Sequence, residues 1–294
     1  MRWRFASRRA SAAALWLCVA APFVARVPLA AGEDRVFSTR TIERTLAVTT
    51  PCRLSLDNVW GGIRLTGHAL PAVEIKVVET VRAESAAAAE RAALEVELEI
   101  GERDGAIDVF VDGPFRHRHD RWRWNDRHRD PGYVVTYDFE VGVPRECDVN
   151  VRTVTDGEVE VSNVAGALSV RNVNGGIRLE RVAGTGGEVR TVNGPILGTF
   201  LRVPTDSLSF DTVNGRIDVT FPPRLAADLT LTTNWGEIWS EFDVTPRPTP
   251  PPTRRREGGR LVIETGPATL RVGTGGPEIS FKTLNGDIFI RKES

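Results

Sequence analysis

The sequence predicts a mainly all-β fold, a β-solenoid or β-helix of about 20-residue coils with a strand-helix-strand insertion near its N-terminus. Three observations lead to this prediction. Asn-Gly turns recur, apolar residues keep fixed offsets from each turn, and 27 Gly with 18 Pro provide for many turns. With 41% hydrophobic residues among 294, the chain can bury a sizeable core. We expect a single solenoid domain over residues 32–294.

The segment 1–31 has the layout of a secretory signal peptide. Its first ten residues contain four arginines and no acid, an apolar stretch follows, and Ala30-Ala31-Gly32 places small residues near a cleavage point. An uncleaved anchor is the alternative, although the apolar run is short for a spanning helix and Pro22 interrupts it. No later apolar run reaches spanning length. We therefore expect an exported protein in the periplasm, on the cell surface or outside the cell, without a transmembrane segment in the mature chain.

The repeat becomes visible when the glycine of each turn is taken as the origin. These glycines are Gly61, Gly157, Gly175, Gly194, Gly215, Gly236 and Gly286. Two residues later each copy carries Ile or Val, five and seven residues earlier most carry an apolar residue, and three residues earlier Thr or Asn recurs. The period from Gly157 to Gly236 is 18 to 21 residues, which is typical of a solenoid. Independent hairpins of an unrelated β-sandwich would not need the same residue type at the same offset.

The Asn-Gly pairs are predicted to form corners between stacked coils, because glycine accepts positive φ without penalty and asparagine tolerates it. The structural turn residues are Asn174, Gly175, Asn193, Gly194, Asn214, Gly215, Asn285 and Gly286. The Thr/Asn column is in phase with the inward apolar columns. We expect its hydroxyls and amides to form a hydrogen-bonded ladder near the corner.

Residues 66–148 interrupt the period. Residues 72–83 and 93–113 alternate apolar and polar side chains as strands do, and residues 133–144 return as another strand. Between the first two, residues 84–94 are rich in alanine and predict a short helix. We expect this insertion to cap one end of the solenoid, since an open end invites edge pairing.

A loop over residues 115–131 concentrates unusual chemistry. Residues 115–130 hold six Arg, three Asp, two Trp and three of the four His in the chain. His117, His119 and His128 are candidate metal ligands, and Arg121, Trp122, Arg123 and Trp124 are candidate ligand contacts. We favour a solvated loop over a metal site because no closed ligand set with standard spacing is present.

A second irregular stretch, residues 245–259, is rich in proline and ends in a basic run. This composition predicts an extended excursion from the fold. Its arginines could touch an anionic surface, and a solvated loop is the default interpretation.

Two cysteines remain after residue 31, and they occupy the same register. Cys52 lies two residues before Leu54, and Cys147 two before Val149. If these coils are neighbours, equivalent Cα atoms are about 4.8 Å apart, within range of a disulfide. We predict a Cys52–Cys147 disulfide, with two free thiols as the alternative.

With these features in view, the chain resembles a bacterial putative-adhesin family of β-strand-repeat proteins of unknown function. The residues that carry the likeness are "LSLDNVWGGIRL", the serial "TVNG-x-I" coils and "LNGDIFIRK". The resemblance implies an exported β-solenoid, and it supplies no established activity, cofactor or catalytic residue. The chain departs from the pattern at Trp60 and Trp235, where Trp replaces Asn before Gly.

These features favour a non-catalytic, exported adhesin or envelope module that binds a cell-surface glycan or an envelope protein. A formal net charge of −1 gives no basic bias towards nucleic acid. One alternative is a β-helix enzyme acting on polysaccharide, which needs clustered carboxylates on one face. The residues after the turn glycines change type from coil to coil and form no such pair. The other alternative is a module that senses envelope state through a protein partner.

Overall fold

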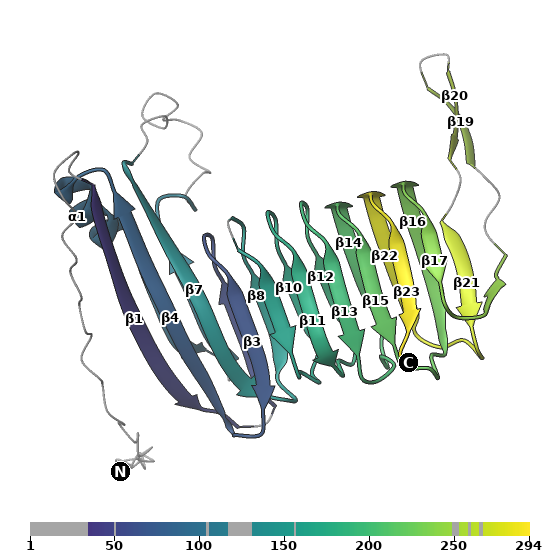
Figure 1. Cartoon of the computed structure of the whole chain (residues 1–294), viewed down its shortest axis with the longest axis horizontal. Helices are drawn as coiled ribbons and strands as arrows, with labels where there is room; N and C mark the ends of the chain where they lie inside the picture. The colour runs from purple at the N-terminus through teal and green to yellow at the C-terminus, as the bar shows by residue number, and fades with distance from the viewer. Residues whose placement is uncertain are drawn as a thin grey trace, which may run out of the picture.

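The computed structural model describes residues 35–49, 51–103, 106–116, 131–155, 157–248, 253–257, 260–264 and 267–294. The predicted signal segment 1–31 and most of the loop 115–131 lie outside these ranges. Within them the chain forms a β-solenoid, which confirms the predicted fold class (Figure 1).

Two large sheets face each other across one hydrophobic core. Sheet A contains, in spatial order, β1 (Val36–Ala47), β4 (Ala72–Ala83), β7 (Tyr133–Pro144), β3 (Ile63–His68), β9 (Val159–Ser162), β11 (Ile177–Val182), β13 (Ile196–Phe200), β15 (Ile217–Phe221), β23 (Ile288–Lys292) and β17 (Ile238–Ser240). Sheet B contains β18 (Val244–Pro246), β21 (Ala268–Val272), β16 (Ala227–Trp235), β22 (Glu278–Asn285), β14 (Leu208–Asn214), β12 (Gly187–Arg190), β10 (Leu168–Arg171), β8 (Asp148–Arg152), β2 (Arg53–Asp57), β6 (Ala106–Asp112) and β5 (Glu97–Arg103).

Four coils cross from sheet B to sheet A through an Asn-Gly corner, at Gly175, Gly194, Gly215 and Gly286, and the coils stack in parallel register. Val170 pairs with Val189 in sheet B, while Ile177 pairs with Ile196 in sheet A. Because neighbouring coils present equivalent positions, the apolar columns of the sequence become continuous inward rows. The side chains of these four residues are fully buried.

Two polar columns hold the corners together. In the exposed column, Asn193 donates a side-chain hydrogen bond to Asn174 and accepts one from Asn214, both at 2.8 Å. In the buried column, Thr191 and Thr212 donate to the turn carbonyls of the adjacent coil, Thr212 to Gly194 at 3.0 Å. The buried side chains therefore bond to backbone rather than to one another, which differs from the expected ladder of hydroxyls and amides. A threonine hydroxyl has one proton to donate. Here it donates to the glycine carbonyl of the adjacent coil, which burial would otherwise leave without a partner.

The stacking order departs from the serial order in the sequence. β22 lies between β14 and β16, and β23 lies between β15 and β17. The final coil of the chain is thus inserted between the coils of Gly215 and Gly236 rather than added at the end. Asn285 donates to Asn214, and Thr283 donates to the carbonyl of Gly215, as serial neighbours would.

The N-terminal insertion both extends and covers the stack. β6 pairs with β2 and β7 with β3 in parallel, so these two strands form one further coil, and most of the segment that joins them lies outside the described residues. Beyond this coil β4 and β1 run antiparallel, β5 pairs with β6, and α1 (Ala86–Glu95) packs against β4 and β7. Ser85 caps α1 by accepting the Ala88 N–H.

At the opposite end sheet B continues through β21 and β18, which are antiparallel to their neighbours. A separate hairpin, β19 (Thr253–Glu257) and β20 (Arg260–Glu264), pairs only with itself within the part of the chain that the structure describes. It falls in the stretch 245–259 and just beyond, where the composition predicted an excursion from the fold. Figure 1 shows it projecting from the sheets.

Candidate functional site

The outer face of sheet A carries a row of charged side chains across its N-terminal strands. Strand pairing aligns Glu43, Lys76, Glu140, Arg64 and Glu160, one from each of five neighbouring strands, and their signs alternate. Lys76 Nζ lies 2.8 Å from Glu140 Oε2, and Arg64 Nε lies 2.8 Å from Glu160 Oε2. Arg64 also reaches Glu140 at 3.9 Å. The alternation follows from cross-strand pairing, since like charges directly opposite would repel.

These contacts determine the protonation of the row. The hydrogen bond from Lys76, with its charge, lowers the pKa of Glu140, and the same hydrogen bond raises the pKa of Lys76. Glu160 raises the pKa of Arg64, chiefly through its hydrogen bond. These shifts favour the charged forms of Glu140, Lys76 and Arg64. Because the side chains are largely exposed, water and salt screen them, and each pair adds little to stability.

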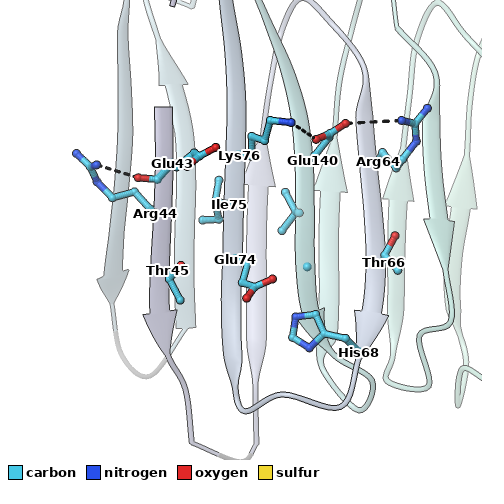
Figure 2. A pocket seen from close by; sticks show the side chains of 12 residues that line it. Glu43, Arg44, Thr45, Arg64, Thr66, His68, Glu74, Ile75, Lys76 and Glu140 are labelled. Atoms are coloured by element: carbon cyan, nitrogen blue, oxygen red, sulfur yellow. Dashed lines mark hydrogen bonds and ion pairs between the residues drawn. The ribbon is translucent and has the colours of Figure 1, made fainter. Parts of the chain in front are cut away.

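A groove of about 530 Å³ opens beside this row, between β1, β4, β7 and β3 (Figure 2). Gly142 leaves room for the His68 ring at one end of the groove. A Cβ at this position would lie 2.9 Å from the imidazole Nε2 of His68 and 3.4 Å from Glu74 Oε2. Figure 2 shows His68 and Glu74 turned towards this part of the groove, below the Lys76–Glu140–Arg64 contacts.

His68 brings an unused hydrogen-bonding atom to the groove. The backbone N–H of Leu70 donates to His68 Nδ1 at 3.2 Å. A neutral imidazole with Nδ1 as acceptor carries its proton on Nε2. That Nε2 is buried and has no partner among the described residues. An acceptor atom of a bound ligand would satisfy it, whereas an unpaired buried donor is costly.

The groove's chemistry suits polar binding. Glu43, Glu74 and Glu140 line it together with Arg44, Arg64 and Lys76. Glu140 is held between two cations and has a lowered pKa, so it is poorly suited to act as a general acid near neutral pH. The other charged side chains that line the groove can donate to or accept from a ligand rich in hydroxyl and amide groups.

Cys52 and Cys147 are joined in a disulfide, with Cα atoms 4.5 Å apart and a sequence separation of 95. Their coils are neighbours, because Arg53 pairs with Asp148 directly beside them. The bond lies at the start of the sheet B strands, and so at the edge opposite the Asn-Gly corners. It closes the chain over the whole N-terminal insertion.

The base of the loop 115–131 is anchored, while its candidate residues lie outside the described ranges. Phe115 packs edge-to-face on Trp60 with ring centroids 4.7 Å apart. Arg116 forms hydrogen bonds with both carboxylate oxygens of Asp57 and stands over the Phe110 ring. Trp60 thus stands where other coils have the corner asparagine, and its ring contacts Phe115 at the base of the loop.

The remaining sequence candidates of this loop, His117, His119, His128, Arg121, Trp122, Arg123 and Trp124, have no described position. Among the residues that are described, no group of three His, Cys, Asp or Glu side chains could hold a metal. No helix in the described ranges is long and apolar enough to cross a membrane. Sequence reasoning missed the groove, because its residues come from four strands and share no linear motif.

The family model described as Toastrack DUF4097 matches residues 147–250. These coils resemble the Toastrack family. The resemblance inferred from the Asn-Gly repeat is confirmed over this Toastrack segment, which runs from the coil of Cys147 through β18. The sequence matches no curated protein.

Three solved structures are similar to the chain. One is a putative cell adhesion protein from Clostridium sporogenes, 11% identical, with a TM-score of 0.40, covering 86% of this chain and 100% of that one. A putative adhesin from Bacteroides fragilis is 10% identical, with a TM-score of 0.37 and coverages of 86% and 97%. A putative lipid binding protein from Parabacteroides distasonis is 10% identical, with a TM-score of 0.26 and the same coverages. No residue role carries over at these identities.

Proposed function

We propose that this protein is an exported, non-catalytic binding module of the cell envelope that presents the outer face of sheet A to a cell-surface glycan or envelope protein. The observation that carries the proposal is the groove beside Gly142, where His68 Nε2 has no hydrogen-bond partner among the described residues and lies near the row of charged side chains. The signal-like segment 1–31 supports export, and the Cys52–Cys147 bond suits an oxidising compartment.

Rigidity is what the solenoid contributes to binding. Repeated backbone pairing and the disulfide hold the face in one shape, so little conformational entropy is lost when a ligand binds. Phe115 and Arg116, the described base of the loop 115–131, are anchored at the same end of the stack, and we infer that this loop supplies a second contact region. An adhesive or structural role in the envelope follows from such a preorganised face.

A binding screen with residues 32–294 tests the proposal on a glycan array and on isolated cell envelopes. The groove variant is His68→Ala with Glu74→Ala. The matched control is Asn150→Ala with Arg190→Ala on the outer face of sheet B, where both side chains are exposed. A third variant lacks residues 117–130 and keeps the anchor at Phe115 and Arg116. We expect the groove variant to lose about tenfold or more in affinity and the control to bind normally.

Two outcomes would overturn the proposal. The first is an absence of binding by the unmodified chain to every glycan and envelope tested. The second is a bound glycan that becomes shorter during incubation, which would indicate the polysaccharide-acting enzyme instead.

A further inference from the structure

A second groove lies farther along the outer face of sheet A, in the Toastrack segment. It encloses about 380 Å³ over β13, where the outward side chains are Leu197 and Thr199. The neighbouring strands β11 and β15 instead present Arg178 and Asp218 in the row of Leu197. The uncharged side chains of β13 thus form the floor of a trough that follows this strand, and charged side chains stand on the strands at both sides.

The trough carries unused positive charge. Four arginines and two acids line it, a net charge of +2. Asp218 is bound by Arg291 through two hydrogen bonds, at 2.7 and 3.1 Å, so this acid is already neutralised. The side chains of Arg178 and Arg216 are exposed, and their guanidinium groups form no hydrogen bond or ion pair with any described residue. This contrasts with Arg64 on the same face, which is paired with two glutamates.

Arg178 and Arg216 line the two sides of the trough, and they are offset by two residues along the strands, since Arg178 is in line with Asp218. Arg178 lies on β11 and Arg216 immediately precedes β15, with β13 between them. Two strand spacings separate these strands by roughly 10 Å. A guanidinium binds a carboxylate or sulfate through two parallel hydrogen bonds. Leu197 on the floor offers apolar contact to the face of a sugar ring.

One wall of the trough is held in an uncommon backbone conformation. Arg181 has φ of 53°, in the left-handed region that disfavours residues other than glycine. Its N–H donates to Thr199 Oγ1 at 3.1 Å, which ties β11 to the floor of the trough. Its side chain reaches Asn163 Oδ1 at 3.4 Å. Strain of this kind persists where the surrounding structure fixes it.

We propose that this trough binds an acidic polysaccharide, with Arg178 and Arg216 contacting its carboxylate or sulfate groups and Leu197 packing on a sugar ring. This inference rests on the proposed function, because it takes a surface glycan as the ligand. It adds the chemical class of glycan that would bind at this second site, which is separate from the His68 groove. Carboxylated and sulfated chains share the anionic chemistry that the guanidinium groups recognise.

Calorimetric titration of residues 32–294 with polygalacturonate, dextran sulfate and uncharged dextran tests the proposal and distinguishes carboxylate from sulfate. The trough variant is Arg178→Ser with Arg216→Ser. The matched control is Arg152→Ser with Arg190→Ser, which removes the same charge from exposed positions on sheet B. We expect at least one anionic chain to bind and dextran not to bind. The trough variant should lose about tenfold or more, and the control less than about twofold.

Equal losses in the two variants would overturn the proposal, because they would mean non-specific attraction of a polyanion. So would the absence of binding to both anionic polymers, or preferential binding to anionic vesicles or single-stranded DNA over either polysaccharide. If the chain still binds cell envelopes through the His68 groove while polyanion binding is absent, only the trough inference fails. If neither kind of binding is observed, the proposed function fails as well.

Discussion

Asn285 donates a side-chain hydrogen bond to Asn214 at 2.7 Å, although 71 residues separate them in the sequence. The contact places the last coil of the chain in the interior of the stack, between the coils of Gly215 and Gly236. In a strictly serial solenoid the final coil would be the outermost and the least costly to lose. Here its removal would leave a gap between two coils that do not otherwise pair.

Deletion of residues 278–294 is therefore expected to abolish cooperative folding. Ile279, Phe281, Ile288 and Ile290 are fully buried, and exposing four such side chains costs roughly 8 kcal/mol, comparable to the whole stability of a typical domain. The measurement is thermal unfolding by circular dichroism together with limited proteolysis. Deletion of residues 249–266, which removes the separate hairpin, is the control and should change Tm little. A truncated chain that unfolds cooperatively near the original Tm would contradict the insertion.

Gly215→Ala should be strongly destabilising. A Cβ at this corner would lie 2.0 Å from the carbonyl oxygen of Gly194 in the adjacent coil, and the neighbour is backbone that cannot move aside. We expect a loss of about 3 kcal/mol or more in the free energy of unfolding, measured in urea. Gly101→Ala is the matched control, because no heavy atom lies within 4 Å of its added Cβ. If both variants lose the same stability, close stacking of the corners is not the reason for the repeated glycine.

The fold class was predictable because the solenoid repeats each of its requirements in sequence. Turn, apolar columns and cysteine register recur at fixed offsets, so Cys52 and Cys147 can be aligned by counting. The inserted last coil was not predictable, since its residues would fit equally well at the end of the stack. The coil of β6 and β7 was missed because residues 113–132 replace its Asn-Gly corner. The part of the repeat pattern that this coil keeps is its apolar residues Ile107 and Phe139, which pair with Leu54 and Ile63.

The His68 groove illustrates why function was harder to predict than fold. His68 is the last residue of β3, directly after its inward-facing residues, so in the sequence it looks only like the end of a strand. Its partners in the groove come from β4 and β7, and Gly142 contributes by lacking a side chain. A site made by the absence of a side chain and by cross-strand neighbours leaves no local pattern.

The disulfide should contribute substantially to stability. Replacing Cys52 with Ser removes a link that closes a long loop, and we expect a loss of about 2–5 kcal/mol in the free energy of unfolding. Reduction of the unmodified protein should lower stability by a similar amount, and reduction should have no effect on the Cys52→Ser/Cys147→Ser variant. Thiol titration of denatured, unreduced residues 32–294 is expected to find no reactive thiol. Two reactive thiols would show that the bond does not form.

Stability should fall at alkaline pH because both tyrosines of the chain are buried. Burial, with a hydrogen bond to Glu95, raises the pKa of Tyr133 to about 12. Burial also raises the pKa of Tyr137, with the charge of Glu79 adding to the effect. A raised folded-state pKa gives stability that is complete below the unfolded value of about 10 and is lost as pH rises towards the folded value.

Absorbance at 295 nm and Tm, measured from pH 8 to about pH 12, test this expectation. Neither tyrosine should ionise near pH 10 while the protein is folded, and Tm should decline above that pH. The Tyr133→Phe/Tyr137→Phe variant should show a shallower decline. Tyrosine titration at about pH 10 in the folded protein would mean that these side chains are accessible to water.

Hydroxyl-radical footprinting of residues 32–294 bound to an envelope surface or to the best ligand of the glycan array is the most direct test of the central claim. That claim is that the outer face of sheet A is the binding face. Protection is expected at His68 and Leu197, with Arg190 and Lys282 on the outer face of sheet B remaining reactive. Protection of the sheet B side chains, with His68 and Leu197 as reactive as in the free protein, would contradict the claim.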